Sequence, residues 1–529
     1  MPKVLVSDSL APQGLEIFER AGGIQVDYQP GIGAAELERA IASADALVIR
    51  SDTKVTADVI AAAPDLKVIG RAGTGVDNVD VAAATARGIA VMNTPGGNNI
   101  TTAEHSVALL VALARHIPQA TASMKAGKWE KKKFVGLELF NRTLGIVGIG
   151  RIGRIVADRA RGLGMKVIGH DPYLGAGANT SLADVELVSF EGLLERADAI
   201  SVHVPRTKDT VGLLGREALE RVKPGLLLVN AARGGIVDEE ALLEALNAGR
   251  VAGAALDVFV EEPPPADHPL VKHERVICTP HLGASTEQAQ VNVAVAVAEQ
   301  VRDYLLHDII GNAVNVPSIS REILGEVRPY LALAEKLGRF QGQLCPGSID
   351  QIDIEYSGEA AALNVAPITV AVLKGLLESM SDQVNMVNAP VLAQERGIKV
   401  IESKVNRTSD FASAITTRVK GCLDRLIEGA IFHGGQPRIV RVDDFMLEAI
   451  PEGPTLLIHN HDRPGVVGQV GVLLGEAGVN ISRMQLALVR ERGEACMLVN
   501  VDSDPGDAAM ERLRDLEHMI SAQLVDLGP

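Results

Sequence analysis

The alternation of apolar and polar positions predicts short strands separated by helices along the first half of the chain. In the first 95 residues, short apolar runs at 3–7, 46–50 and 67–71 are typical of buried strands. A helical pattern over 14–20 follows the first run. Strands that alternate with helices predict a parallel, doubly wound sheet.

A second unit of the same kind follows the turn-rich segment Asn93–Asn98 and a long helical pattern over 101–120. Its first strand is expected at 144–147, and the unit continues to about residue 285. A helix rich in Ala and Val then covers 288–306 and could return the chain to the first unit. The expected domains are both Rossmann-like and comprise 1–97 with 287–317, and 98–286.

The second half of the chain has a different pattern. Residues 318–452 mix helix and strand patterns, which predicts an α+β domain, and Pro451–Pro454 is a candidate linker. The last 75 residues predict a small ferredoxin-like domain, 453–529, with elements in the order β-α-β-β-α. Its expected strands are 455–459, 485–489 and 495–501, and its expected helices are 465–477 and 508–522.

Composition narrows the class of protein. Of 529 residues, 47% are apolar and 22% are charged, which is ordinary for a soluble globular protein. The formal net charge of −16, with no long basic run, argues against nucleic-acid binding. The N-terminus has no basic region followed by an apolar run, and no stretch approaches the roughly 20 apolar residues that cross a bilayer. We therefore expect a cytoplasmic protein without a membrane partner.

The four cysteines are far apart in the sequence, at Cys278, Cys345, Cys422 and Cys496. They show neither the close pairs of a zinc site nor the density of a secreted disulfide scaffold. We therefore expect no metal site.

A glycine motif marks the candidate cofactor site. The strand expected at 144–147 runs into Gly148-Ile149-Gly150-Arg151-Ile152-Gly153 and then into a helix, the context that G-x-G-x-x-G requires. Its glycines allow a tight turn, close approach of a pyrophosphate and packing of helix on strand. Asp171, 18 residues beyond Gly153, would accept hydrogen bonds from ribose hydroxyls and repel a 2′-phosphate. The expected cofactor is NAD rather than NADP, and an unliganded glycine-rich turn is the alternative.

Three polar residues follow expected strands of the second unit, at the strand ends where ligands bind in such sheets. They are Arg233, Glu262 and His281. A histidine can take up the hydroxyl proton during hydride transfer, a carboxylate can hold its imidazole, and an arginine can bind a substrate carboxylate. Each alone could be an ordinary loop residue, a solvated acid or part of a structural ion pair. Together, after the glycine motif, they predict a dehydrogenase.

The surrounding segments resemble the signature segments of the D-isomer-specific 2-hydroxy-acid dehydrogenase family. They are N-A-A-R-G-G-I-V-D at 230–238, A-A-L-D-V-F-V-E-E-P at 254–263 and T-P-H-L-G-A-S-T at 279–286. The resemblance implies two doubly wound domains with the active site in the cleft between them, and Arg233, Glu262 and His281 as catalytic residues. It also implies that Thr74, Ala232, Asp257 and the loop 281–284 lie near the cofactor.

The first unit resembles the D-3-phosphoglycerate dehydrogenases at V-I-R-S (48–51) and G-R-A-G-T-G-V-D-N-V-D (70–80). The resemblance implies that Arg50 reaches a substrate phosphate and that Arg71 lies at or near the site. The backbone from Gly73 would hold the substrate carboxylate, and Asn98 would be a further contact. A phosphate with nearly two negative charges requires several cations in a concave site. The expected substrate is 3-phospho-D-glycerate.

The C-terminal half extends the resemblance. Segments at 351–355, 387–397 and 437–440 resemble the intervening domain of the longest phosphoglycerate dehydrogenases, and 458–465 with 477–481 resemble an ACT domain, which binds amino acids between subunits. The resemblance implies feedback by L-serine, with Asn460, Asp462 and Asn480 as candidate ligands. The bacterial pattern has His at the position of Asn460 and Asn at that of Asp462, so the domain could serve assembly alone.

The expected reaction is NAD-dependent oxidation of 3-phospho-D-glycerate to 3-phosphooxypyruvate, the first step of L-serine biosynthesis. The family implies a homo-oligomer, with a tetramer expected, in which Lys131–Lys133 lie near a neighbouring site or form a solvated run. One alternative is reduction of an unphosphorylated 2-oxo acid such as glyoxylate, hydroxypyruvate or 2-oxoglutarate. The other is a non-catalytic, NAD-sensing corepressor on the same fold.

Overall fold

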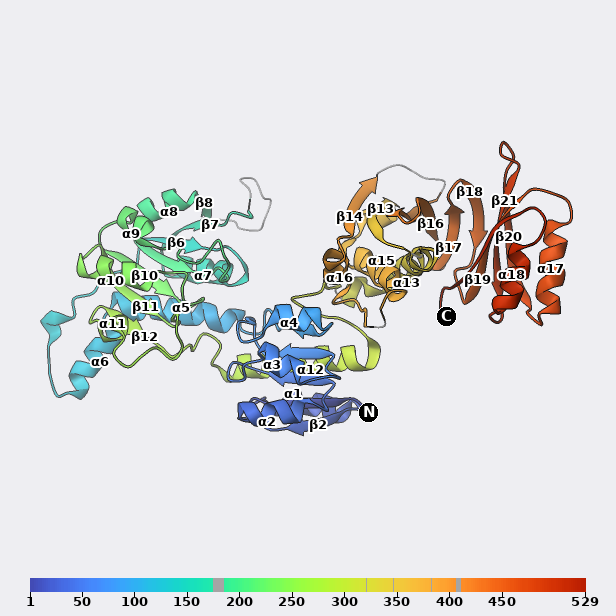
Figure 1. Ribbon diagram of the computed structural model, residues 1–529. Coiled ribbons are helices and arrows are strands. Elements are labelled where there is room, and N and C mark those ends of the chain that lie inside the picture. Colours follow the sequence, from blue (N-terminus) through green and yellow to red (C-terminus); the bar gives the residue numbers. More distant parts are fainter. Residues whose placement is uncertain (175–184, 320, 346, 382, 406–410) are drawn as a thin grey trace.

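The computed structural model describes residues 1–174, 185–319, 321–345, 347–381, 383–405 and 411–529, and in these residues the chain forms four sheets (Figure 1). Two parallel sheets with Rossmann-like connections come first, a mixed sheet follows, and an antiparallel sheet ends the chain. This order confirms the predicted fold class. No helix in these ranges is long and apolar enough to cross a membrane.

The first sheet is parallel and has the strand order β2-β1-β3-β4-β5. Its central strands consist almost entirely of buried apolar residues because helices cover both faces. The strands are β1 (Lys3–Val6), β2 (Gln25–Tyr28), β3 (Ala46–Ile49), β4 (Val68–Arg71) and β5 (Ala90–Met92). The helices are α1 (Pro12–Arg20), α2 (Ala34–Ile41), α3 (Ala57–Ala61) and α4 (Val81–Ala86).

The second sheet is also parallel, with the order β12-β11-β10-β9-β6-β7-β8. Its strands are β6 (Thr143–Val147), β7 (Lys166–His170), β8 (Glu186–Leu187), β9 (Ala199–Val202), β10 (Leu226–Asn230), β11 (Val251–Leu256) and β12 (Val276–Cys278). The helices are α5 (Asn99–Ala114), α7 (Arg151–Gly162), α8 (Phe190–Arg196), α9 (Arg216–Arg221), α10 (Glu239–Asn247) and α11 (Pro269–Lys272).

The long helix expected over 101–120 is two helices, α5 and α6 (Ile117–Lys125). His116 between them has a left-handed backbone, with φ of 52°. Pro118 lies in the first turn of α6, where its missing amide hydrogen costs nothing. The apolar periodicity runs through this break and did not reveal it.

The chain crosses between the two parallel sheets twice, once before α5 and once before α12 (Glu287–His307). Helix α12 packs against α1 and β4 of the first sheet, where Gly70 leaves room for Val297 and Val301. At the two crossings the hydroxyls of Thr101 and Thr286 lie 3.1 Å apart. The starts of both crossing helices are therefore in contact.

The third sheet is mixed, in the order β14-β13-β15-β16-β17-β18, and β14 is parallel to β13. Helices α13 (Arg321–Leu344) and α15 (Ala366–Glu378) pack closely, since a Cβ at Gly338 would overlap the Val372 carbonyl oxygen. A disulfide joins Cys345 to Cys422, whose Cα atoms are 5.9 Å apart. The other elements are β13 (Ile349–Gly358), α14 (Glu359–Ala362), α16 (Ala389–Glu395), β14 (Lys399–Val405), β15 (Ser413–Gly421), β16 (Arg425–Phe432), β17 (Gln436–Val442) and β18 (Phe445–Ala449).

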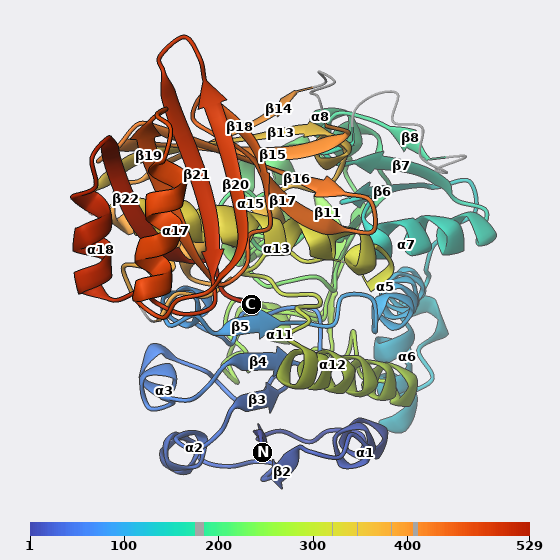
Figure 2. The ribbon, with the colours of Figure 1, turned by 90° about the vertical axis from the view of Figure 1, so that its right-hand side faces the viewer.

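The fourth sheet is antiparallel, in the order β20-β21-β19-β22, with α17 (Val466–Glu476) and α18 (Asp507–Arg514) on its outer face (Figure 2). Its inner face packs on the third sheet and α13, where Leu457 and Leu498 join the same apolar core. The strands are β19 (Pro454–His461), β20 (Ile481–Val489), β21 (Glu494–Val501) and β22 (Met519–Asp526).

The helix expected over 508–522 is wrong in its second half. Helix α18 ends at Arg514, and residues 519–526 form β22, which pairs with β19. His518 has a left-handed backbone, with φ of 73°, and reverses the chain between the two elements. The pairing partner lies about sixty residues earlier, so a local pattern could not show it.

Candidate active site

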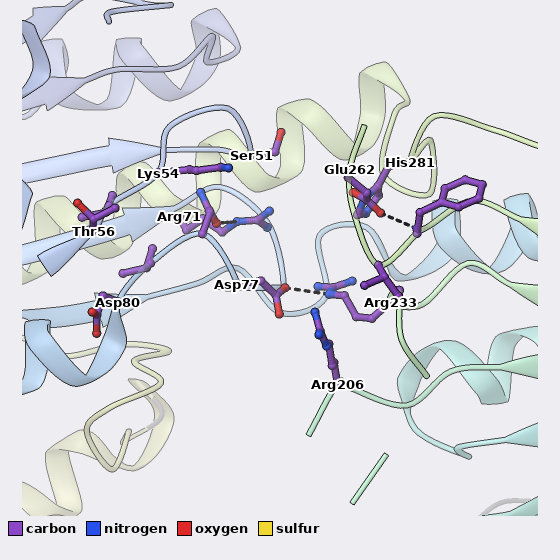
Figure 3. Close-up of a pocket in the computed structure, with 16 residues that line it drawn as sticks. Ser51, Lys54, Thr56, Arg71, Asp77, Asp80, Arg206, Arg233, Glu262 and His281 are labelled. Atoms are coloured by element: carbon purple, nitrogen blue, oxygen red, sulfur yellow. Dashed lines mark hydrogen bonds and ion pairs between the residues drawn. The ribbon is translucent and has the colours of Figure 1, made fainter. Parts of the chain in front are cut away.

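A cavity of about 650 Å³ lies between the first and second sheets, at the carboxyl ends of their strands (Figure 3). Side chains from both sheets line it, and most of the polar ones are charged. The first sheet contributes Lys54, Arg71, Asp77 and Asp80, and the second contributes Arg206, Arg233, Glu262 and His281. The structure therefore brings together the three predicted catalytic residues.

His281 and Glu262 form a pair at this cavity. The His281 Nδ1 atom lies 2.7 Å from Glu262 Oε2, and the Phe259 amide donates to Glu262 Oε1 at 3.0 Å. Burial would raise the pKa of the Glu262 carboxyl, but the hydrogen bonds from His281 and Phe259 and nearby positive charges lower it overall. The ionised carboxylate orients Nδ1–H towards itself, so Nε2 is the imidazole atom presented to a substrate.

Asp257 anchors the loop that carries His281. Its carboxylate is 1% exposed and accepts hydrogen bonds from the amides of Leu282 at 2.7 Å and Gly283 at 2.9 Å. The Thr279 hydroxyl donates to the same carboxylate at 2.6 Å. The Asp257 carbonyl oxygen accepts from the His281 amide at 2.9 Å. The position of His281 therefore depends on this buried acid.

Arg233 crosses the cavity to the first sheet. Its Nε atom donates to Asp77 Oδ2 at 2.9 Å, and its Nη1 atom donates to the Ala232 carbonyl oxygen at 2.7 Å. A Cβ at Gly75 would overlap the Arg233 guanidinium, so glycine allows this close approach. A guanidinium held by an exposed carboxylate can exchange that partner for the carboxylate of a ligand.

Arg71 places a half-buried positive charge on the first-sheet side of the cavity. Its Nε atom donates to Asn78 Oδ1 at 3.3 Å, a neutral partner. Burial lowers the pKa of Arg71 to about 10, and the positive charges of Arg233 and Arg50 act in the same direction. A site that disfavours its own cation in this way gains free energy when an anion enters.

Arg50 does not line the cavity, although it lies close enough to lower the pKa of Arg71. Its guanidinium donates to the Ser9 carbonyl oxygen at 3.4 Å, and its amide donates to Asp8 at 2.6 Å. Of the two predicted arginines, therefore, Arg71 lines the cavity and Arg50 does not.

The sequence reasoning missed four charged residues of the cavity, Lys54, Asp77, Asp80 and Arg206. Arg206 follows β9, so the rule that favoured Arg233, Glu262 and His281 could have found it. Lys54 lies five residues beyond the end of β3, and Asp77 lies six beyond the end of β4, as far as Glu262 lies beyond β11, so a position after a strand could have pointed to them as well.

The glycine motif has the geometry that a dinucleotide requires. Gly148 has φ of 93°, and a Cβ there would come within 2.6 Å of the His203 carbonyl oxygen. A Cβ at Gly153 would overlap the Gly148 carbonyl oxygen, whereas nothing lies within 4 Å of a Cβ at Gly150, where α7 begins. Open space before a helix N-terminus suits a pyrophosphate. Arg151 and Ile152 form the first turn of α7.

Asp171 follows β7 and holds the glycine loop from the side. Its Oδ2 atom accepts from the Ile149 amide at 3.0 Å and its Oδ1 atom from the Tyr173 amide at 3.0 Å. Each carboxylate oxygen keeps a lone pair for a ribose hydroxyl. These residues therefore fit NAD.

Thr74 and Asn98 meet beside the first crossing, where Thr74 Oγ1 lies 2.8 Å from Asn98 Oδ1. The Gly73 carbonyl oxygen accepts from the Thr94 amide at 2.9 Å. None of these three residues lines the cavity itself. They connect the loop after β4 to the start of α5.

The candidate effector residues do not meet within one chain. Asn460 and Asp462 lie at the end of β19, beside Glu494 at the start of β21. The Asn480 amide donates to Asp502, just beyond the other end of β21, at 3.0 Å. Eight strand residues separate the two places by roughly 25 Å. Asn460 is 3% exposed, and its Oδ1 atom has no hydrogen-bond partner among the described residues.

Lys131–Lys133 form a short 3-10 helix with exposed side chains, away from the cavity lining. The preceding Trp129 is 79% exposed.

Comparison with protein families gives three matches that together follow the order of the sheets. The NAD binding domain of D-isomer specific 2-hydroxyacid dehydrogenases matches residues 107–283. The D-3-phosphoglycerate dehydrogenase intervening domain matches 326–443, and the ACT domain matches 454–518.

Relatives extend over the whole chain. A D-3-phosphoglycerate dehydrogenase of Archaeoglobus fulgidus is 43% identical over 99% of this chain and 100% of its own. One of Bacillus subtilis is 42% identical over 100% of both chains.

Solved structures match the two parallel sheets. The TT0316 protein of Thermus thermophilus is 37% identical, covers 59% of this chain and 99% of its own, and has a TM-score of 0.55. An NAD-dependent formate dehydrogenase of Staphylococcus aureus, solved with NAD, is 30% identical, covers 60% of this chain and 100% of its own, and has a TM-score of 0.54. These matches and the site geometry identify the chain as an NAD-dependent oxidoreductase that belongs to the D-3-phosphoglycerate dehydrogenase family.

Proposed function

We propose that the protein oxidises 3-phospho-D-glycerate to 3-phosphooxypyruvate, as the first step of L-serine biosynthesis. The observation that carries this proposal is the cavity in which the His281–Glu262 pair lies together with four cationic side chains from both sheets. They are Lys54, Arg71, Arg206 and Arg233. A simple hydroxy acid needs one cation for its carboxylate. The further cations of the same cavity suit a second, doubly charged group such as a phosphate.

NAD, when bound, accepts the hydride from the alcohol carbon of the substrate. The residues of the chain manage the proton and the orientation. His281 Nε2 takes the hydroxyl proton, and Glu262 stabilises the imidazolium that results. Arg233 exchanges Asp77 for the substrate carboxylate and holds the reacting carbon towards the cofactor. Arg71, Lys54 and Arg206 bind the phosphate, and Arg50 adds to the positive potential.

The cofactor would lie along the glycine motif. Gly150, Arg151 and Ile152 at the start of α7 would hold its pyrophosphate, and Asp171 would accept hydrogen bonds from its adenosine ribose. Thr74, Ala232 and Asp257 lie towards the nicotinamide end. In this proposal residues 1–97 with 287–317 form the substrate-binding domain and 98–286 form the cofactor-binding domain. Arg206 and Arg233 reach the substrate from the second domain, and Thr74 reaches the cofactor from the first.

The fourth sheet would bind L-serine as a feedback effector. The unpartnered Asn460 Oδ1 atom is an acceptor for an ammonium group, and burial without a donor is unfavourable for it. Asp462 is its neighbour on the same chain, whereas Asn480 would have to come from a second copy. The proposal therefore requires an oligomer, and we expect a tetramer in which Lys131–Lys133 approach a neighbouring subunit.

The test is NADH formation from 3-phospho-D-glycerate at alkaline pH, with L-serine titrated in. Turnover that serine suppresses supports both parts, and turnover without serine sensitivity retains the enzyme and leaves the fourth sheet with an assembly role. The variant R206A should raise KM for 3-phospho-D-glycerate roughly tenfold, the value of one charge-assisted hydrogen bond. Faster turnover of glyoxylate, hydroxypyruvate or 2-oxoglutarate would reject the phosphate assignment.

A further inference from the structure

Helix α5 contacts the 279–283 loop, which carries His281. The proposed function assigns no role to this contact. The helix lies against β10, β11 and β12 (Figure 1). Two of its side chains, three positions apart and thus on one face, reach the loop. Thr102 donates to the Gly283 carbonyl oxygen at 2.8 Å, and His105 lies beside Asp257 and Thr279.

The His105 Nε2 atom lies 3.2 Å from Asp257 Oδ1 and 3.2 Å from Thr279 Oγ1. An ionised carboxylate oxygen only accepts, so Nε2 must carry a hydrogen. The Thr279 hydroxyl already donates its hydrogen to Asp257 and can only accept from His105. The geometry therefore fixes Nε2 as the protonated nitrogen, whatever the state of Nδ1.

Asp257 needs such a donor because its carboxylate is almost completely buried. A buried carboxylate is stable only with donors on its lone pairs. Its other side-chain partners, the Thr279 hydroxyl and the amides of Leu282 and Gly283, belong to the 279–283 loop itself and cannot hold the acid in place independently of that loop. His105 is a donor from a separate, rigid element, so it couples the loop to α5.

We propose that His105 is a positioning residue, which fixes Asp257 and Thr279 and thereby places His281 opposite Glu262. The kinetic part of this inference rests on the proposed function, and the structural part does not. Loss of the His105 contact would let the 279–283 loop move while Arg71 and Lys54, on the other sheet, keep their positions. The expected signature is a lower kcat with a nearly unchanged KM for the phosphorylated substrate.

Two amide substitutions separate hydrogen bonding from shape. The Gln side chain places its amide where His places Nε2, whereas the shorter Asn side chain does not reach it. H105Q should therefore keep most of the activity, and H105N should lower kcat by roughly 10- to 100-fold, as loss of a residue that orients a functional group does elsewhere. E104Q is the matched control, since Glu104 is the adjacent, exposed residue of α5.

Hydrogen exchange of the peptide that spans 278–286 supplies a readout that needs no turnover. In H105N the Leu282 and Gly283 amides should exchange on the order of tenfold faster, which corresponds to one hydrogen bond. H105Q and E104Q should match the parent protein, and peptides from β19–β21 should not change in any variant. Thermal unfolding of each variant checks that the fold is intact.

The inference is overturned if H105N leaves loop exchange unchanged, or if H105Q and H105N change it equally. A parent protein that exchanges as expected but does not oxidise 3-phospho-D-glycerate would reject the proposed function and leave the role of His105 standing. The converse, normal turnover with an H105N loop as protected as the parent, would reject the role of His105 alone.

Discussion

The two walls of the cavity hold their charges in different ways. On the second sheet, His281 is matched to Glu262, and a buried acid with several donors fixes the loop behind it. On the first sheet, Arg71 donates to the neutral Asn78 and is destabilised as a cation by burial and by other positive groups. Groups that react need orientation, which paired partners supply. A group that binds an anion needs donors that are free to receive it, and the one partner of the Arg71 guanidinium named above is a neutral amide.

The largest effect on activity should come from the second-sheet wall, which carries His281 and Glu262. H281N should lower kcat by about 10³-fold, within the range for loss of a general base, and leave NADH binding intact. E262Q should cost less, since a neutral amide still accepts from Nδ1. Steady-state rates and NADH fluorescence titration measure the two effects. Comparable KM increases with unchanged kcat in both variants would mean that this wall only binds.

On the first-sheet wall, R71M should lower kcat/KM for 3-phospho-D-glycerate by about 10- to 100-fold, mainly through KM, because charge-assisted bonds to the phosphate are lost. The rate with hydroxypyruvate should change much less. R39M, at an exposed arginine of α2, is the control for loss of positive charge. Equal losses with both substrates would show that Arg71 does not distinguish the phosphate.

Replacing Asp257, which supports the loop of His281, should change the free energy of unfolding in a pH-dependent way. The hydrogen bonds to Asp257 lower the pKa of its carboxyl below the ordinary value, although burial opposes them. Its contribution is therefore complete above the unfolded pKa of about 4 and is lost as pH falls through the folded pKa. At pH 7, D257N should be less stable by about 1–3 kcal/mol. Urea unfolding at pH 7, 5 and 3.5 should show the difference narrowing only at the lowest pH.

The smallest effect on activity is expected at the Asp77–Arg233 ion pair, which joins the two walls. Asp77 is 61% exposed and pairs with Arg233, so the pair contributes at most about 1 kcal/mol. D77N frees Arg233 and should lower KM for the substrate about two- to fivefold, since the ligand no longer competes with the carboxylate. Initial rates at several salt concentrations would measure this. An increase in KM would assign Asp77 a direct part in binding.

The sequence predicted the features of the site that are local. Gly148 and Gly153 each satisfy a steric demand set by nearby backbone, and the strands expected at 46–50 and 67–71 lie within one residue of the observed β3 and β4. Arg233, Glu262 and His281 could be selected because each follows a buried strand, and parallel strands end at one edge.

The missed features depend on contacts between distant segments. Asp77 meets Arg233 across 156 positions, and His105 meets Asp257 across 152, so no spacing rule connects them. Likewise β22 is a strand because β19 offers it an edge, and Cys345 finds Cys422 only because α13 and β15 end together. Asn480 was grouped with Asn460 by resemblance, and the register of β21 separates them within one chain.

The contact between Thr101 and Thr286 has a mechanical consequence. In the described part of the chain, the two passages between the parallel sheets lie at these adjacent places, so a rotation of one sheet relative to the other would pivot there. His281 lies five residues from Thr286 and would move least during such a rotation, while Lys54, in a loop of the other sheet, would sweep through a longer arc. His281 would thus keep its position relative to the cofactor, while Lys54 moves towards the phosphate and back. Mutations that change substrate capture and mutations that change proton transfer would therefore lie at different distances from this pivot.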